Sequence, residues 1–271
     1  MTNCLPDVEF SGISIAGPVR EDNQDSIFLP DTDHGKSHGQ LFAIADGMGG
    51  YSLGNIASQM AIESVSSAVY SMERPNPSAL KAGIDRANLQ VYNTAVKSGV
   101  GRMGTTITAA YLIGDTLHLG HIGDSRAYIV RNGKSTCLTV DHTQVGEMVR
   151  AKLLSPDRVR THASRSVLTR AVGIDLFVRP DITSHHLMEG DRVILCTDGV
   201  WSVIEDVEFG TKTKNLPVEL VSQSLIDLAL SRDTDDNASV VAFEITKLNL
   251  PVTVPQPHKI NWLQKLRKMT Q

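Results

Sequence analysis

Aromatic side chains and excess positive charge are both scarce in this sequence of 271 residues. Aromatic residues make up 5% of the chain and the formal net charge is -4. Such a composition lacks the stacking surface and the basic patch that are typical of nucleic-acid-binding proteins. The chain also has no apolar run of the ~18 to 20 residues that a membrane-spanning helix needs. We therefore expect a globular protein that has no transmembrane segment and does not bind nucleic acid.

Cysteine is rare as well. The three cysteines, Cys4, Cys137 and Cys196, form no spaced pairs, which indicates a reducing compartment rather than a disulfide framework. The first ten residues have neither the basic region nor the apolar region of a secretory signal. These two absences predict a cytoplasmic protein.

Short apolar or β-branched runs alternate with turn signals along most of the chain. They predict strands at 12–16, 26–29, 41–45, 105–113, 116–122, 126–131, 192–196 and 239–245. Helical spacing predicts helices at 55–72, 78–97 and 217–231. Because strands and helices fall into separate groups, we expect an α+β fold with helices outside antiparallel sheets, and a continuous meander over residues 105–137.

The composition changes near the end of the sequence. We expect one domain over residues 1–248, followed by a proline-containing linker and a basic amphipathic tail over residues 249–271. A frayed end, a short helix folded back on the domain, and a docking tail for an acidic partner or a membrane face all agree with this pattern.

Aspartates stand where apolar strands begin or end. These positions are Asp25, Asp46, Asp124, Asp198 and the pair Asp235-Asp236. Turn chemistry explains any one of them, but neither Asp46-Gly47 nor Asp198-Gly199 precedes a returning strand at hairpin distance. If the strand ends converge, two carboxylates ~4 Å apart repel by ~4 kcal/mol at an effective dielectric of 20. Either most of these carboxylates are protonated or divalent cations lie among them, and all-oxygen ligation by aspartates is the preference of Mg²⁺ and Mn²⁺.

Eight short motifs follow one another along the chain. They are Arg20-Glu21-Asp22-Asn23-Gln24-Asp25, Asp46-Gly47-Met48-Gly49-Gly50, Gly104-Thr105-Thr106, Gly123-Asp124-Ser125-Arg126, Leu138-Thr139-Val140-Asp141-His142, Leu168-Thr169-Arg170-Ala171-Val172-Gly173, Thr197-Asp198-Gly199 and Asp236-Asn237. This ordered set, over residues 13–245, resembles the bacterial form of the metal-dependent protein phosphatases of the 2C type. The resemblance implies a four-layer αββα sandwich, with two antiparallel sheets flanked by helices and the metal site at one edge.

The resemblance also implies how two Mn²⁺ or Mg²⁺ ions would be held. Asp46 would bridge both ions, and the carbonyl of Gly47 would bind one of them. Asp198 would be a further ligand of this core pair. The family uses the aspartate of an Asp-Asn pair as the last ligand, which here is Asp236 rather than Asp235.

Three more roles follow from the same resemblance. Asp25 would hold a metal directly or through water, and Asp124 would join Asp198 in a weaker third metal site. Arg20 would grip the substrate phosphate, which suits its planar guanidinium. Arg20 and Asp46 are thus the expected catalytic residues.

The expected reaction is hydrolysis of phosphoserine and phosphothreonine in proteins by a metal-activated water, which reverses a Ser/Thr kinase. The alternatives are a catalytically inactive relative used as a binding or sensing module, and an enzyme that hydrolyses small phosphoesters. Eukaryotic relatives have a histidine where this chain has Met48, so a metal-bound water is our candidate for the proton donor, with His142 and His162 as alternatives.

Residues 143–167 correspond to the variable flap beside the family's active site. Arg158, Arg160 and Arg165 in this segment could meet an acidic or phosphorylated peptide, or could belong to a solvated charged helix.

Overall fold

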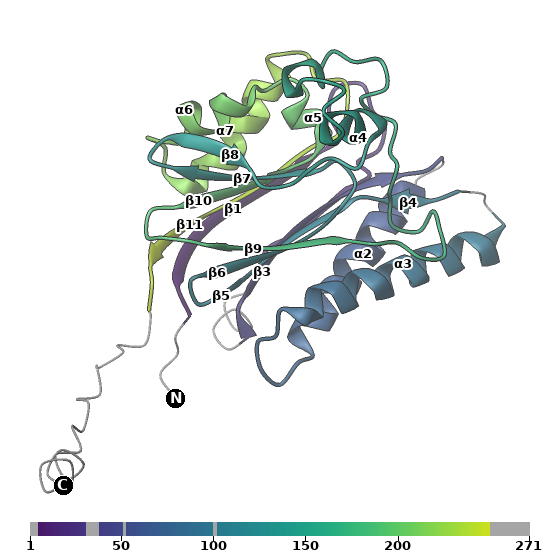
Figure 1. The fold of residues 1–271 in the computed structure, drawn as a ribbon, viewed down its shortest axis with the longest axis horizontal. Coiled ribbons are helices and arrows are strands. Elements are labelled where there is room, and N and C mark those ends of the chain that lie inside the picture. Colours follow the sequence, from purple (N-terminus) through teal and green to yellow (C-terminus); the bar gives the residue numbers. More distant parts are fainter. Residues whose placement is uncertain (1–4, 31–37, 51–52, 100–101, 250–271) are drawn as a thin grey trace, which may run out of the picture.

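The computed structural model describes residues 5–30, 38–50, 53–99 and 102–249. In these residues two antiparallel sheets lie face to face, and helices cover the outer side of each sheet (Figure 1). This arrangement confirms the α+β class and the four-layer sandwich that the motifs imply. Cys4 and residues 250–271, which hold nearly all of the predicted linker and tail, lie outside the described residues.

The first sheet contains the strands at both ends of the domain. Its order is β1-β11-β10-β7-β8, and helices α5, α6 and α7 cover its outer face (Figure 1). The bounds are β1 (Asp7–Ile15), β7 (Arg126–Arg131), β8 (Lys134–Cys137), β10 (Arg192–Cys196), β11 (Ala238–Lys247), α5 (Asp198–Trp201), α6 (Asp206–Thr213) and α7 (Val218–Leu230).

The second sheet has the order β2-β3-β5-β6-β9, and β4 pairs with the end of β3. Helices α2 and α3 cover its outer face (Figure 1). The bounds are β2 (Asp25–Phe28), β3 (Gln40–Met48), β4 (Gly104–Thr105), β5 (Ile107–Ile113), β6 (Thr116–Ile122), β9 (Asp181–His186), α2 (Leu53–Tyr70) and α3 (Ser78–Ser98). Of the helices in the described ranges, none has the length and apolar character that crossing a membrane requires.

The continuous apolar run of β3 is explained by burial on both faces of the strand. Phe42 and Ile44 point between the two sheets, where Phe42 stacks on Phe243 of β11 at a ring distance of 4.1 Å. Leu41 and Ala43 point the other way, under α2 and α3. Alternate residues of a strand face opposite sides of the sheet, so a strand between two apolar layers has no polar positions. This packing holds the end of β3 rigidly.

The meander expected over residues 105–137 is wrong at one point. Strands β5 and β6 pair in the second sheet, whereas β7 and β8 pair in the first. The chain crosses between the sheets at Gly123, whose φ of 106° lies in the region that favours glycine. A Cβ at this position would also lie 2.5 Å from the side chain of Thr106. The crossing therefore places Asp124 at the edge where the two sheets meet.

The sequence patterns did not reveal β9, and they gave a helix in the flap, which the structure has as α4 (Gln144–Arg150), only as one alternative. Strand β9 has the sequence Asp-Ile-Thr-Ser-His-His and is mostly exposed, since it is the last strand of its sheet. An exposed edge strand needs little apolar surface, so it lacks the hydrophobic alternation by which strands are found.

Candidate metal centre and active site

Asp25 and Asp46 lie opposite each other on neighbouring antiparallel strands. The strand register pairs Asp25, the first residue of β2, with Asp46 near the end of β3. Directly opposed side chains leave the same face of a sheet, with Cβ atoms about 4.5–5.5 Å apart. The amide of Asp46 donates to Thr106 Oγ1 at 2.8 Å, and its carbonyl accepts from the Thr106 amide at 2.8 Å. These bonds fix the backbone from which the Asp46 carboxylate projects.

The buried carboxyl group of Asp25 is only partly satisfied. Its Oδ2 accepts hydrogen bonds from Ser239 Oγ at 2.6 Å and from Thr197 Oγ1 at 2.9 Å. Its Oδ1 is buried and has no hydrogen-bond partner within the part of the chain that the structure describes. Burial raises the pKa of Asp25 to about 7 despite the two hydroxyl donors, and the charges of Asp198 and Asp236 add to the rise. A cation beside Oδ1 would favour the ionised form.

Asp198 and Asp124 lie outside the strands, in the connections that follow β10 and β6. Asp198 opens α5, with one residue between it and the end of β10, and Asp124 lies in the crossing between β6 and β7. Burial, with the charge of Asp236, raises the pKa of Asp198 to about 6. Burial and the charge of Asp198 raise the pKa of Asp124 well above its ordinary value. Desolvation and the other four aspartates do the same to Asp46. The pKa values of Asp25, Asp46, Asp124 and Asp198 are therefore all raised.

Arg20 and Asp236 form an ion pair at the rim of the site. Arg20 Nη2 donates to Asp236 Oδ2 at 2.8 Å, and the Arg20 side chain is 54% exposed. Asn237, the residue after Asp236, binds the segment that carries Arg20: its Oδ1 accepts from the Gln24 amide at 3.0 Å and its Nδ2 donates to the Asp22 carbonyl at 2.9 Å. Asn237 therefore holds the segment that carries Arg20 next to Asp236. The Asp-Asn motif gave no indication of this role.

An open cavity of about 740 Å³ joins these groups. Six of the seven predicted site residues line it, namely Arg20, Asp46, Gly47, Asp124, Asp198 and Asp236. Asp25 is the exception, because it is buried behind Asp46. Ser166 and Leu168 bring the end of the flap to the same cavity. Within the described ranges, no three His, Cys, Asp or Glu side chains already form a close-set ligand cage. Asp46 and Asp198 are close enough for a side-chain hydrogen bond, and the four aspartates that line the cavity share its open space.

The donor set at this cavity fits divalent metal ions. It consists of carboxylate oxygens and a strand-end carbonyl, the hard ligands that Mg²⁺ and Mn²⁺ prefer. In the described structure, Asp25 and Asp198 each carry a buried oxygen that lacks a hydrogen-bond partner. At Gly47 an added Cβ would lie 2.0 Å from the Gly54 carbonyl oxygen and 2.6 Å from that of Gln24. Glycine alone therefore allows the backbone after Asp46 to pack this closely.

Comparison with known proteins identifies the family. Residues 12–238 match the protein phosphatase 2C family. The chain belongs to this family. The Ser/Thr protein phosphatase PstP of Mycobacterium tuberculosis is 33% identical over 259 residues, which cover 92% of this chain and 47% of PstP. The chain thus spans about half the length of that curated relative.

Solved structures of the protein phosphatase 2C family share the fold. The Ser/Thr phosphatase Stp1 of Staphylococcus aureus superimposes with a TM-score of 0.83 at 25% identity, covering 90% of this chain and 98% of Stp1. The catalytic domain of PstP in complex with two manganese ions gives a TM-score of 0.76 at 30% identity, covering 88% of this chain and 97% of that one. The family uses divalent metals.

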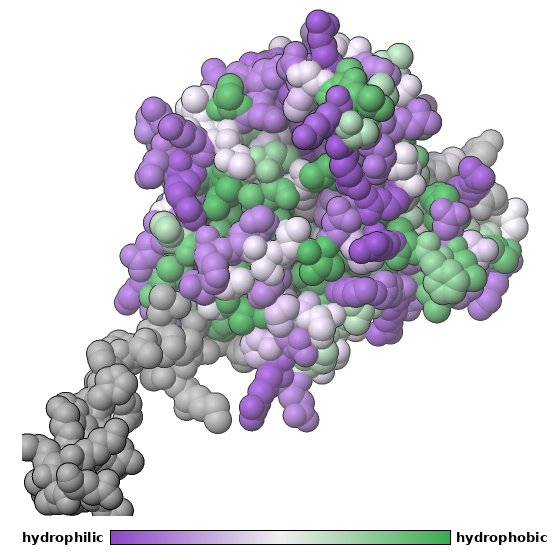
Figure 2. All heavy atoms as spheres, viewed as in Figure 1, coloured by the Kyte–Doolittle hydropathy of each residue, from purple (hydrophilic) through white to green (hydrophobic). Residues whose placement is uncertain are grey.

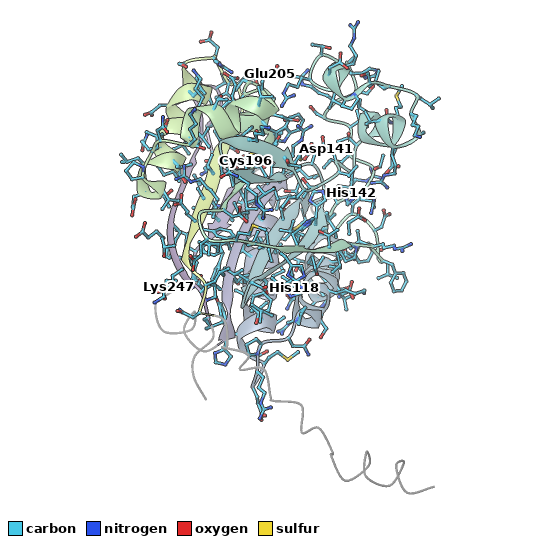
Figure 3. All side chains as sticks on the ribbon, turned by 60° about the vertical axis from the view of Figure 1, so that its left-hand side comes forward. His118, Asp141, His142, Cys196, Glu205 and Lys247 are labelled. Carbon is cyan, nitrogen blue, oxygen red and sulfur yellow. The ribbon has the colours of Figure 1, made fainter. Side chains whose placement is uncertain are left out.

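In this protein phosphatase 2C domain, the described residues that line the cavity include neither His142 nor His162. The buried ring of His142 accepts a hydrogen bond from the Gly123 amide at Nδ1 (3.1 Å), and its Nε2 lies 3.2 Å from Asp181. Burial lowers the pKa of His142. His162 accepts from the amide of Ser164 within its own turn. Both histidines brace local structure, and Figure 3 shows His142 close to Asp141 at the foot of the flap.

A buried ion pair between Arg126 and Asp141 was not foreseen, although both residues belong to the motifs. Arg126 binds Asp141 through two hydrogen bonds of 3.0 and 2.7 Å. The guanidinium carbon lies 3.7 Å from the centre of the Trp201 ring, and Trp201 Nε1 donates to the Asp124 carbonyl at 2.9 Å. This series of contacts connects the ion pair to the backbone of Asp124. Motif positions alone cannot show that the two residues meet.

Asp141→Ala is expected to lower the free energy of unfolding by about 3 kcal/mol, because the buried Arg126 then keeps only the longer ion pair with Asp206, at 3.4 Å. The measurement is urea unfolding without metal. Asp85→Ala is the matched control: Asp85 pairs with Lys81 at 2.6 Å on the exposed face of α3, and its loss should cost less than about 1 kcal/mol. Equal small losses in both variants would contradict the structural role of the buried pair.

Arg160 of the flap anchors the flap to the domain. It pairs with Asp206 at 2.6 Å and donates to the carbonyls of Trp201 at 2.9 Å and Ile204 at 3.0 Å. Its side chain is 13% exposed. Arg160 therefore has a structural role and does not bind a peptide. The other two flap arginines considered for peptide binding, Arg158 and Arg165, are exposed.

Proposed function

We propose that this chain is a metal-dependent protein-Ser/Thr phosphatase. One observation carries the proposal: four aspartates of the family motifs and Arg20 line one open cavity, with Asp25 buried behind it. A set of acids that oppose one another's ionisation suits a site that binds divalent cations. The match to the protein phosphatase 2C family supports the same conclusion.

The metal ligands of this proposal are the residues that meet at the cavity. Asp46, Asp198, Asp236 and the Gly47 carbonyl would hold a core pair of Mn²⁺ or Mg²⁺ ions, with Asp46 as the central ligand. Asp25 takes part directly or through water. When bound, a pair of divalent cations supplies an activated water and a positive clamp for the charge that develops on phosphorus. The structure of PstP with two manganese ions is the relative that supports a core of two ions.

A weaker third site is proposed for Asp124 together with Asp198. Both line the cavity, and burial together with the charge of Asp198 raises the pKa of Asp124. Asp124 is held by the Trp201 indole, which binds its carbonyl.

Arg20 positions the substrate in this proposal. Its guanidinium lies at the rim of the cavity and is bound to Asp236 alone among the side chains of the described residues. When Asp236 serves as a metal ligand, its carboxylate would hold Arg20 less tightly. The guanidinium fork is then available to bind two oxygens of the substrate phosphate. The proton for the leaving oxygen comes from water, since no histidine is among the described residues that line the cavity.

The proposed substrates are phosphoserine and phosphothreonine side chains of proteins, so the enzyme reverses a Ser/Thr kinase. PstP and Stp1 are both named as serine/threonine phosphatases. An open cavity admits a side chain that stands out from a polypeptide. A protein substrate is therefore favoured over a small phosphoester.

Phosphate release from a phosphothreonine peptide tests this function. We expect turnover with Mn²⁺, a loss of about 10³-fold or more after EDTA treatment, and recovery when Mn²⁺ is restored. p-Nitrophenyl phosphate is assayed in parallel to separate small-ester hydrolysis from peptide hydrolysis. Metal-dependent peptide binding without turnover would instead identify an inactive binding module.

A further inference from the structure

A second cavity, of about 620 Å³, lies beside the flap and is rich in arginine. Its volume is within the range of about 300–1,000 Å³ that is usual for ligand sites. The lining residues are Arg150, Arg170, Arg179, Pro180, Asp181, Ile182 and Thr183. We call this set the basic groove. It is formed by the end of α4, the segment before β9 and the start of β9.

The positive charges of the basic groove are not fully compensated. Arg170 donates to Asp181 at 2.9 Å, and Arg150 lies 3.9 Å from Asp181 and 3.5 Å from Glu147. Arg179 is exposed, and its guanidinium makes no hydrogen bond or ion pair within the described part of the chain. Three guanidinium groups thus share two carboxylates, which leaves one positive charge. Figure 2 shows strongly hydrophilic side chains on the face of the molecule that carries α4 and β9.

The basic groove adjoins the candidate active site. Leu168 lines the 740 Å³ cavity, and Arg170 lines the basic groove. Two residues of extended chain span at most about 7 Å, so the rims of the two cavities are neighbours. Strand β9 is the last strand of its sheet, so the groove is open on that side. One polypeptide can therefore occupy both cavities.

An exposed aromatic residue lies two positions before Arg179 of the groove. Phe177 is 85% exposed, and the Asn88 side chain holds its loop on α3 by donating to the carbonyls of Asp175 and Leu176 at 3.0 and 3.1 Å. A phenylalanine presented to solvent on an anchored loop is typical of a surface that contacts another polypeptide. The combination of an apolar residue and surplus positive charge favours an acidic peptide over a free inorganic anion.

We propose that the basic groove binds negatively charged side chains of the phosphoprotein substrate, next to the phosphorylated residue in the active site. This inference rests on the proposed function and adds a preference for acidic sequence. Arg179 is the main determinant, because its charge is uncompensated. Arg150 assists from α4, and Arg170 chiefly holds Asp181 in place.

The test compares two phosphothreonine peptides that differ only by Glu→Gln changes flanking the phosphothreonine. The wild type should show a kcat/KM about tenfold higher for the acidic peptide at low ionic strength, and added salt should reduce this ratio. Arg179→Gln should bring the ratio close to one. Arg158→Gln is the matched control, since Arg158 is a flap arginine that is 72% exposed and lies outside the groove. This variant should keep the wild-type ratio.

A charge exchange sharpens the test. Arg179→Glu should prefer a peptide with Lys at the flanking positions, which a merely structural role of Arg179 would not produce. Equal ratios in the wild type and Arg179→Gln, or an equal loss in Arg158→Gln, would overturn the inference while leaving the proposed function intact. Fluorescence anisotropy of labelled acidic peptide provides a readout without turnover. Arg179-dependent binding with no phosphate release from any substrate would reject the proposed function alone.

Discussion

Asp46→Asn is expected to lower Mn²⁺-dependent phosphate release from a phosphothreonine peptide by about 10³-fold or more. Asp46 faces Asp25 across β2 and β3 and lines the cavity with Asp124, Asp198 and Asp236. An asparagine has nearly the same shape but carries no charge. The substitution therefore removes the central anionic ligand with little change in packing. Initial rates at saturating peptide and Mn²⁺ measure the effect.

The same substitution should stabilise the protein in EDTA. Desolvation and the other aspartates raise the pKa of Asp46 well above its ordinary value, so its ionisation opposes folding at neutral pH. Removing that charge should raise the thermal midpoint by about 2–4 °C for each kcal/mol gained. A loss of activity combined with a gain in stability separates a functional role from simple misfolding.

Asp235→Asn is the matched control for Asp46→Asn. Asp235 is exposed and precedes Asp236, but it does not line the cavity. Its replacement should leave turnover within about twofold of the wild type, because Asp235 is exposed and its charge is screened by salt. Near-normal turnover in Asp46→Asn, or an equal loss in Asp235→Asn, would reject the assignment of the metal ligands.

Manganese affinity should fall by about 10²-fold between pH 8 and pH 5.5. The pKa of Asp25 is raised to about 7 and that of Asp198 to about 6, from ordinary values of 3.8. Both carboxylates are ionised at pH 8 and largely protonated at pH 5.5. Because a metal ion binds the ionised forms, protons compete with Mn²⁺ throughout this window.

The free energy of unfolding of the metal-free protein should instead fall as the pH rises. The raised pKa values mean that the folded state binds more protons than the unfolded state between about pH 4 and 7. The contribution of Asp25 and Asp198 is therefore favourable at low pH and is lost as the pH rises through 6 to 7. Thermal unfolding in EDTA and calorimetric titration with Mn²⁺ at several pH values measure both effects. An affinity that is independent of pH would contradict a site built from these two acids.

The strongly patterned elements were predicted well from the sequence. Strands β6, β7 and β10 have the predicted bounds, and α3 differs by one residue. Their apolar residues are buried, and burial is what produces a hydrophobic pattern. Strand β9 was missed because it is polar and lies at the edge of its sheet, and the meander over residues 105–137 was wrong because a pattern of alternation does not tell which strands pair.

The positions of the acidic residues were visible in the sequence, but their contacts were not. The motifs pointed to Asp46, Asp124, Asp198 and Asp236, all of which line the cavity. The buried location of Asp25 behind that cavity, with one oxygen unpaired, emerged only from the fold. The same holds for the Arg20–Asp236 ion pair, which joins residues 216 positions apart.

The sequence by itself determined the fold class, the family and the residues that carry negative charge to the strand ends. These features are local, since each motif is a short run of residues whose types can be read directly. Only the tertiary structure decided that β6 and β7 belong to different sheets, that Arg160 is an anchor, and that Arg150, Arg170 and Arg179 share a groove. Such contacts depend on long-range packing, and neither spacing nor composition encodes which distant surfaces meet.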